Sequence, residues 1–480
     1  LRLSKILRKE FEYKGAICYG EHHRSHAAST FYASGFQKAA VLTVDGVGEW
    51  STTTWGVGEG TDLHLKGEII FPHSLGLLYS AFTYYLGFKV NSGEYKVMGL
   101  APYGAPKYVD RIKKLIHIKE DGSFRLHMEH FCFDYGMRMY LPSFEEVMGA
   151  PTRPLDSGEM TQFHKDVARS LQEVVNEIMV KLAQKAMNEA GSKNLCLAGG
   201  VALNCVANGH ILRETDVENI FIQPAAGDNG GAMGAALWLW HDVMKKERKW
   251  KLTSPYLGPE YTVHDIESTL QRYNATYKKE ENETLLQVVA EAIDSGKVIG
   301  WYQGRQEWGP RALGNRSILG DPRHPKMREI INMKIKMREG FRPFAPSVVA
   351  ERSQDYFELD GESPYMLLVA PVKQEIQESE TPLHAITHVD GSARIQTVTR
   401  IQNQKYYDLI KIFEARTGYG VVINTSMNVR GEPIVNTPED CYRCFMRTDM
   451  DVLVMGDFIM HKEKQPKLEL STAAEEFGLD

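Results

Sequence analysis

Short apolar segments alternate with amphipathic segments through the first half of the chain. The run AAVLTVDG (39–46) predicts a buried strand that ends in a tight turn. The run STTTWGVGEG (51–60) predicts the following strand from its alternating threonine and aromatic positions. Apolar residues at helical spacing predict one long amphipathic helix over residues 158–190. This alternation of strands and helices is typical of an α/β fold.

Two later segments place glycine turns between a strand and a helix. NLCLAGGVALN (194–204) predicts a strand, a Gly-Gly turn and a helix start, and NIFIQPAAGDNGGAMGAALWLW (219–240) predicts the same order with a longer glycine-rich loop. At such turns the backbone can approach a ligand closely, and the helix N-terminus favours an anion. With the turn after residue 44, three such turns resemble the nucleotide cleft of the actin, sugar-kinase and chaperone ATPases.

A charged and turn-rich stretch separates this half from a second α/β pattern. The boundary is predicted near residues 245–262, and strands are predicted again at GKVIGWYQGR (296–305) and VVINTSMN (421–428). A chain of 480 residues is too long for one ordinary core. We therefore expect two domains, 1–250 and 260–480.

Composition and charge exclude several classes of protein. Hydrophobic residues make up 43% and charged residues 25%, as in ordinary globular proteins, and the net charge of −6 leaves no basic excess to neutralise a nucleic-acid backbone. No apolar run approaches the ~20 residues that span a bilayer. The one CxxC, Cys441 and Cys444, has no second pair, which favours ordinary thiols over a zinc site. We expect a cytoplasmic enzyme that binds neither nucleic acid nor membrane.

Histidine and aspartate residues at three positions along the first half suggest a metal site. If GEHHRSHAASTFYAS (20–34) is helical, His22 and His26 lie on one face one turn apart and can chelate a divalent metal. Asp45 ends a buried strand, and Asp228 lies between a strand and a helix, where ligands converge in open α/β sheets. Such a set suits iron(II), zinc or manganese equally. The alternatives are a structural helix for the histidines and an Asx turn or helix cap for each aspartate.

Basic residues in the second half stand next to glycine, proline and phenylalanine rather than among polar residues, which predicts semi-buried, fixed side chains. Fixed cations combined with hydroxyls and amides bind phosphates, so an acyl phosphate or a triphosphate would fit. The alternative is a set of structural ion pairs. The candidates are Arg311, Arg316, Ser317, Lys336, Arg342, Arg394, Thr397, Asn424, Ser426 and Asn428.

Several long motifs, from about Glu21 to Val435, resemble those of the NodU/CmcH/TobZ O-carbamoyltransferases. They are EHHRSHAASTFYASGF, VDGVGEW, PHSLGLLYSAFTYYLGF, GEYKVMGLAPYG, GGVALN, GPRALGNRSIL, REGFRPFAP and NTSMNVRGEPIV. The resemblance implies an actin-ATPase-like, TsaD-like carbamoyl-transfer domain followed by a YrdC-like α/β domain. The second domain would make carbamoyl-adenylate from carbamoyl phosphate and ATP, with Mg²⁺ on the ATP. The first would transfer the carbamoyl group to a hydroxyl of a small-molecule acceptor.

The resemblance also assigns roles to individual residues. It implies iron or another divalent metal on His22, His26, Asp45 and Asp228, and it places carbamoyl-adenylate near Gly76, Gly200 and Asn204. It places carbamoyl phosphate and ATP on Arg311, Lys336, Arg342, Arg394, Asn424 and Ser426, with Lys336 and Arg342 taking part in catalysis.

Several expectations stay open at this point. The chain begins with Leu1, and no His-containing loop of the kind with which the family begins precedes Glu21, so we expect a missing N-terminal segment that holds the general base. His23 is a weaker candidate for that base. Carbamoyl transfer to a protein thiol, a TsaD-like tRNA-modifying protein and a non-catalytic ATP-binding module are the alternative functions. The acceptor is not predicted, and a homodimer is left open.

Overall fold

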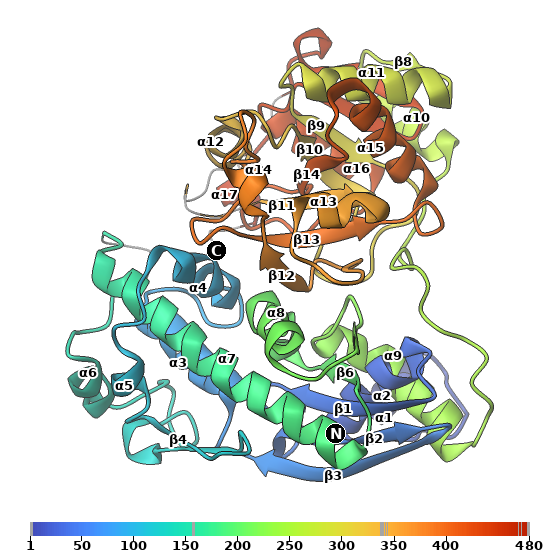
Figure 1. Ribbon diagram of the computed structural model, residues 1–480. Coiled ribbons are helices and arrows are strands. Elements are labelled where there is room, and N and C mark those ends of the chain that lie inside the picture. The colour runs from blue at the N-terminus through green and yellow to red at the C-terminus, as the bar shows by residue number, and fades with distance from the viewer. Residues whose placement is uncertain are drawn as a thin grey trace.

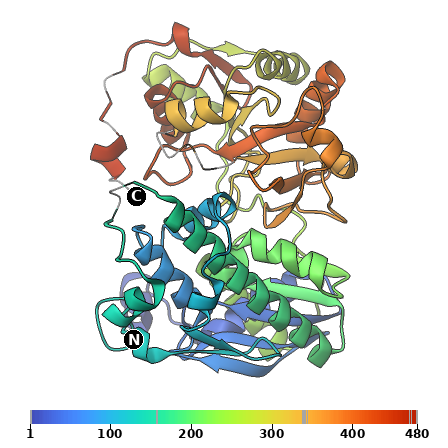
Figure 2. The same ribbon diagram turned by 60° about the vertical axis from the view of Figure 1, so that its left-hand side comes forward.

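The computed structural model of the protein describes residues 3–155, 159–336, 340, 342, 344–468, 470–471 and 473–477. Most of the strands in these residues belong to two mixed sheets. The first has the order β3-β2-β1-β6-β7 and the second the order β12-β13-β11-β14-β10-β9-β15-β16-β8. In Figure 1 the first sheet and its helices lie below and the second lies above, and the turned view in Figure 2 keeps this separation.

All strands of the first sheet come from residues 38–222, and β4 and β5 form a separate hairpin. Strand β1 pairs antiparallel with β2 and parallel with β6, so its carboxyl end and that of β6 meet at one edge. The strands are β1 (Lys38–Val44), β2 (Ser51–Glu59), β3 (Asp62–Ile70), β4 (Ile116–Ile118), β5 (Phe124–Leu126), β6 (Asn194–Ala198) and β7 (Asn219–Ile222).

Helices cover both faces of the first sheet because the central strand β1 is apolar on both sides. Ala39 and Val41 belong to the core cluster that contains α2, and Ala40 and Leu42 belong to the one that contains α7. The helices of this half are α1 (Leu3–Glu10), α2 (His22–Ser34), α3 (Leu75–Tyr85), α4 (Glu94–Leu100), α5 (Val109–Ile112), α6 (Pro142–Met148), α7 (Gln162–Ala190), α8 (Cys205–Glu214) and α9 (Gly231–Leu237), which continues as a π-helix over Trp238–Val243.

The long helix predicted over 158–190 is α7, which runs diagonally across the first half in Figure 1. It begins at Gln162, because the Thr161 N–H donates to His164 Nδ1 (3.1 Å) and fixes the start of the helix there. It ends at Ala190, and Gly191, whose φ of +60° suits glycine, follows as the C-cap. Residue 158 itself lies outside the described residues.

All strands of the second sheet come from residues 278–461. They are β8 (Lys278–Lys279), β9 (Ile299–Tyr302), β10 (Arg316–Gly320), β11 (Ala345–Val349), β12 (Leu368–Pro371), β13 (Ser392–Val398), β14 (Val421–Ser426), β15 (Val452–Met455) and β16 (Phe458–His461). The helices are α10 (Val263–Arg272), α11 (Asn282–Asp294), α12 (Met327–Ile330), α13 (Ser353–Tyr356), α14 (Gln374–Gln377), α15 (Gln404–Thr417), α16 (Pro438–Arg447) and α17 (Ala473–Phe477). Cys441 and Cys444 are buried on α16 as free thiols.

The two halves meet where α8 docks on the edge strand β12. The Asn208 Nδ2 donates to Leu367 O (3.0 Å) and an Arg213 guanidinium N–H donates to Val369 O (2.9 Å). At Gly209 a Cβ atom would lie 2.2 Å from Val369 O, so the two elements are in close contact. Between Val243 and Val263 the chain forms neither helix nor strand. The division into domains 1–250 and 260–480 falls there and stays a prediction.

No helix among the described residues is both long enough and apolar enough to cross a bilayer.

Candidate metal cluster and anion-binding cavity

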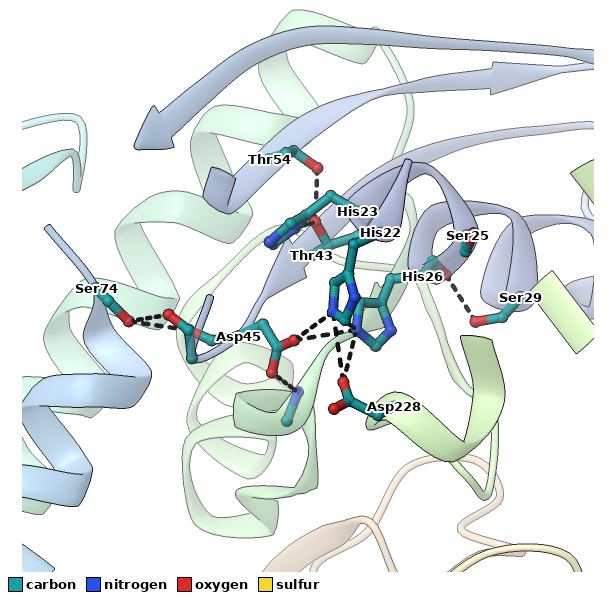
Figure 3. A network of polar contacts seen from close by, with 12 residues as sticks. His22, His23, Ser25, His26, Ser29, Thr43, Asp45, Thr54, Ser74 and Asp228 are labelled. Carbon is teal, nitrogen blue, oxygen red and sulfur yellow. Dashed lines mark hydrogen bonds and ion pairs between the residues drawn. The ribbon is translucent and has the colours of Figure 1, made fainter. Parts of the chain in front are cut away.

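Four side chains from three separate segments converge at one edge of the first sheet (Figure 3). His22 and His26 lie on the first two turns of α2, Asp45 directly follows β1, and Asp228 precedes α9. One ligand atom from each residue lies within 4.8 Å of the other three. The two Nε2 atoms are 2.9 Å apart and lie 2.9 and 3.1 Å from Asp45 Oδ2. Their distances to Asp228 Oδ1 are 3.4 and 3.5 Å.

This geometry fits a divalent metal. Ligand atoms about 2.0–2.2 Å from one ion are roughly 3.0–3.5 Å from each other. A single proton between the two facing imidazole nitrogens makes one hydrogen bond and leaves neither nitrogen with a further proton for the carboxylates. A cation at the centre satisfies both nitrogens and both carboxylates at once.

The charges in the cluster favour a cation at the same place. Burial alone would lower the pKa of His26, but the hydrogen bonds with Asp228 and Asp45 outweigh it and raise the pKa to about 9. Burial would raise the pKa of Asp45, but hydrogen bonds from His22 and His26 hold it well below its usual range. The two carboxylates thus stabilise positive charge at the ring nitrogens, which a divalent ion would supply in place of a proton.

The backbone around Asp45 is fixed by close packing. Gly76 lies in the first turn of α3, where a Cβ atom would be 2.6 Å from Asp45 O. The Ser74 Oγ, which caps α3, donates to Gly46 O (2.5 Å). On the other side, the Gly200 N–H donates to Asp45 Oδ1 (2.9 Å). Gly76 and Gly200, both predicted to lie near carbamoyl-adenylate, are therefore direct neighbours of the cluster.

The cluster is buried on one side and open on the other. His26 is 1% exposed at its side chain, whereas the Asp228 carboxylate is 75% exposed. The backbone N–H of His22 donates to Glu49 Oε2 (3.0 Å). His23 faces away from the cluster and hydrogen-bonds with Thr43 Oγ1 (2.7 Å), as Figure 3 shows. The open side of the cluster is therefore the side of Asp228.

Asn204 links the cluster to a cavity at the junction of the two halves. It caps α8 by accepting from the Ala207 N–H (3.1 Å), and its amide exchanges two hydrogen bonds with Gln172, both 3.1 Å. Gln172 lines the cavity, whose volume is about 420 Å³. The turn that starts at Gly200 thus runs from the Asp45 carboxylate to a residue of the cavity wall.

The cavity gathers all six residues that were predicted to contact carbamoyl phosphate and ATP. They are Arg311, Lys336, Arg342, Arg394, Asn424 and Ser426. Among the described residues, no carboxylate forms an ion pair with Arg311 or Arg394, and the Nε of each is buried without a hydrogen-bond partner. Burial, and then repulsion from Arg394, lower the pKa of Arg311 to about 9. Such neighbouring guanidinium groups favour a bound anion.

The remaining polar residues of the cavity already have protein contacts. Lys336 Nζ donates to Asn428 Oδ1 (2.6 Å) and Asn428 O (3.0 Å), and it also contacts Ser426. The Asn424 Nδ2 donates to Gln396 Oε1 (2.9 Å) and to backbone and side-chain groups around it. These bonds fix the positions of both side chains before any ligand binds.

Sequence reasoning did not find the wall that the first half supplies to the cavity. Residues of α4, α7 and α8 line it, and Tyr95 on α4 lies with its ring 5.3 Å from the Arg342 guanidinium carbon. Arg169 of α7 also lines the cavity and pairs with Glu173 (2.6 Å). These residues carry no motif spacing of their own. Among them only Tyr95 belongs to one of the motifs that carry the family resemblance, GEYKVMGLAPYG.

Comparisons with known proteins agree over nearly the whole chain. Residues 2–237 match the family model for the carbamoyltransferase N-terminus, and residues 290–462 match the one for the carbamoyltransferase C-terminus. An uncharacterized protein of Synechocystis sp. is 53% identical, over 97% of this chain and 79% of that protein.

Two relatives with descriptive names match this chain at lower identity, and one of them matches a shorter part of it. The nodulation protein NolNO of Sinorhizobium fredii is 40% identical, over 96% of this chain and 67% of that protein. The 3′-hydroxymethylcephem-O-carbamoyltransferase of Streptomyces clavuligerus is 32% identical, over 63% of this chain and 55% of that protein. The chain therefore belongs to the carbamoyltransferase family and is an enzyme.

Proposed function

We propose that the protein is an ATP-dependent O-carbamoyltransferase. It makes carbamoyl-adenylate from carbamoyl phosphate and ATP in the cavity and transfers the carbamoyl group to a hydroxyl of a small-molecule acceptor at the cluster. The observation that carries this proposal is the convergence of the four predicted basic side chains on one cavity of about 420 Å³. The turn from Gly200 to Asn204 links this cavity to Asp45 of the candidate metal cluster. A cephem O-carbamoyltransferase among the relatives supports a hydroxyl as the acceptor group.

The architecture of the first half supports an actin-ATPase-like fold. Three antiparallel strands, β3-β2-β1, are continued by the parallel strands β6 and β7. This mixed five-stranded sheet is compatible with the actin-ATPase-like fold that the sequence motifs suggest. The second half, a mixed sheet with helices on both faces, would be the YrdC-like adenylate-forming part.

The activation step needs positive charge around phosphate oxygens. Water first cleaves carbamoyl phosphate into carbamate and phosphate. A carbamate oxygen then attacks the α-phosphorus of ATP, and the bond from that phosphorus to the bridging oxygen breaks and releases pyrophosphate. The side chains of Arg311, Arg342 and Arg394 would offset the charge on the phosphate oxygens, and Mg²⁺ would accompany the ATP. Lys336, held by Asn428, adds a fourth fixed cation.

The transfer step moves the carbamoyl group from AMP to the acceptor. The hydroxyl oxygen attacks the carbamoyl carbon, the bond from that carbon to the AMP oxygen breaks, and the hydroxyl proton passes to a general base. His22, His26, Asp45 and Asp228 would hold iron(II) or another divalent metal, which when bound supplies a Lewis acid. His23 is a poor base at neutral pH, because burial, with repulsion from His26, lowers its pKa to about 4.

Carbamoyl-phosphate-dependent exchange of labelled pyrophosphate into ATP tests the activation step. We expect the wild-type enzyme to catalyse this exchange and to lose it when carbamoyl phosphate is omitted. The absence of exchange in folded enzyme supplied with Mg²⁺ would favour the non-catalytic ATP-binding module. Mass spectrometry then identifies the acceptor. A carbamoylated protein thiol in place of a carbamoylated hydroxyl compound would contradict O-transfer.

A further inference from the structure

A short loop between β9 and β10 presents Arg311 to the cavity. Arg311 belongs to the second part of this loop, residues 308–315, where two glycines with φ of +112° set the path of the backbone. At Gly309 a Cβ atom would lie 2.5 Å from Pro224 O, and at Gly314 it would lie 2.3 Å from the Tyr406 ring. The loop is therefore in close contact with its surroundings at both ends, and only glycine fits at these two places.

One buried carboxylate accepts hydrogen bonds from several backbone N–H groups at the end of this loop. Glu307, which is 6% exposed, accepts hydrogen bonds at Oε1 from the N–H groups of Leu313 (2.7 Å), Asn315 (2.7 Å) and Arg316 (3.2 Å). Its Oε2 is buried and has no hydrogen-bond partner among the described residues. Three backbone N–H groups converge on one carboxylate oxygen, so the side chain holds this loop at three points.

The carbonyl groups of the same loop are held from the opposite side. Leu313 O accepts from Gln396 Nε2 (2.7 Å) and from the Tyr256 hydroxyl (2.8 Å), and Ala312 O accepts from Asn424 Nδ2 (3.3 Å). Arg311 directly precedes these residues and has no acidic partner in the described part of the chain. Arg394 repels the Arg311 guanidinium, and the hydrogen bonds of the loop backbone help to hold Arg311 in place against this repulsion.

We propose that Glu307 is a positioning residue for the activation step, because its carboxylate fixes the 308–315 loop so that Arg311 faces the bound anion. This inference rests on the proposed function, because the proposed function identifies the anion as carbamoyl phosphate or ATP. Glu307 is not among the cavity-lining residues and acts only through Arg311. Loss of the carboxylate therefore weakens anion binding without removing a group that touches the substrate.

A double-mutant cycle tests this coupling. The variants are Glu307→Gln, Arg311→Ala and the double variant, and the readouts are pyrophosphate affinity by calorimetry and the KM for carbamoyl phosphate in exchange. We expect Glu307→Gln to raise the dissociation constant for pyrophosphate and the KM for carbamoyl phosphate about tenfold, and to leave kcat within about threefold, as for uniform binding. In the Arg311→Ala background the same change should have no further effect. Equal effects in both backgrounds, or no effect in either, would overturn the proposal.

Glu414→Gln is the matched control for a purely structural role. Its carboxylate pairs with Arg352 (2.7 Å) and Lys411 (2.5 Å) in the same half of the chain, away from the cavity. We expect this change to lower Tm and to leave KM and pyrophosphate affinity unchanged. If Glu307→Gln does not fold, Glu307→Asp, whose shorter side chain cannot reach all three N–H groups, carries the same cycle. If the wild-type enzyme does not exchange pyrophosphate into ATP, the proposed function is wrong. The pyrophosphate affinities of the variants still test the coupling of Glu307 to Arg311 in that case.

Discussion

Asp45 has the central place among the four candidate ligands. One carboxylate oxygen contacts both imidazoles, and the other accepts from the Gly200 N–H. We expect Asp45→Asn, which keeps the size but removes the charge, to lower iron or zinc affinity by more than about 100-fold, since changes outside the ligand shell already cost 10–100-fold. Competition with a chelator, read by elemental analysis, measures this.

Asp62→Asn is the control for that experiment. Asp62 is also an aspartate of the first half, but it pairs with Lys245 at the surface (2.6 Å). The Asp62→Asn variant should keep wild-type metal affinity. If the Asp45→Asn variant also kept wild-type metal affinity, Asp45 would not be a metal ligand.

His388 makes the stability of the protein sensitive to acid. Burial lowers the pKa of His388 to about 4. Asp390 acts to raise this pKa, whereas repulsion from Arg394 and Arg328 acts to lower it. The unfolded chain takes up a proton near pH 6.5 and the folded protein only near pH 4, so stability is lost as pH falls between these values. Urea unfolding should show that wild type loses about 2 kcal/mol more than His388→Gln between pH 7 and pH 5. Equal losses in the two proteins would show that the folded protein does not hold His388 in its neutral form.

At the scale of residues, the sequence was sufficient to predict the four side chains of the cluster but not the cavity wall that the first half supplies. His22 and His26 lie one helix turn apart, and Asp45 and Asp228 follow parallel strands, so helix spacing and strand-end positions were enough to suggest the set of four. Tyr95 and Arg169 reach the cavity because α4 and α7 pack beneath the second half. No local pattern encodes that packing.

At the scale of elements, the contact between α2 and α9 sets the distance from the histidines to Asp228. At Gly234, in the middle of α9, a Cβ atom would lie 1.9 Å from Ser25 O on α2. We expect Gly234→Ala to separate the two helices, to lower the free energy of unfolding by about 1–3 kcal/mol and to weaken metal binding about tenfold or more. Chemical unfolding and chelator competition measure the two effects.

Gly231→Ala on the same helix is the matched control. No atom lies within 4 Å of the position that its Cβ would take. An alanine in a helix is about 1 kcal/mol more favourable than a glycine, so this variant should be unchanged or slightly more stable and should bind metal normally. Weaker metal binding in both variants would mean that the α2–α9 contact does not set the cluster.

The elements themselves were predicted well where periodicity and turn residues agree. The strands at 39–46 and 51–60 and the long helix were found to within a few residues. The π-helix at Trp238–Val243 was not predicted, because its sequence has an ordinary helical pattern. Among the nine strands of the second sheet only two were predicted, since the sheet is built from short segments that pair across long stretches of sequence.

At the scale of the whole molecule, the first half supplies part of the cavity in which the second half would activate carbamoyl phosphate. The Tyr95 ring lies over Arg342, and its hydroxyl is 3.4 Å from an Arg342 nitrogen. We expect Tyr95→Ala to lower carbamoyl-phosphate-dependent exchange about fivefold or more, because a cation–π contact contributes on the order of 1 kcal/mol. Tyr135→Ala, at an exposed tyrosine of the same half, should leave exchange unchanged. Equal rates in the two variants would mean that the first half takes no part in activation.

The division of labour between cavity and cluster is tested most directly by the exchange rates of two variants. His26→Ala removes a buried candidate ligand, and Arg342→Ala removes a cation of the cavity. We predict that His26→Ala loses its metal and keeps exchange within about threefold of wild type, whereas Arg342→Ala keeps its metal and loses exchange by about 100-fold or more. A folded His26→Ala enzyme without exchange, or an Arg342→Ala enzyme with the wild-type rate, would contradict this account.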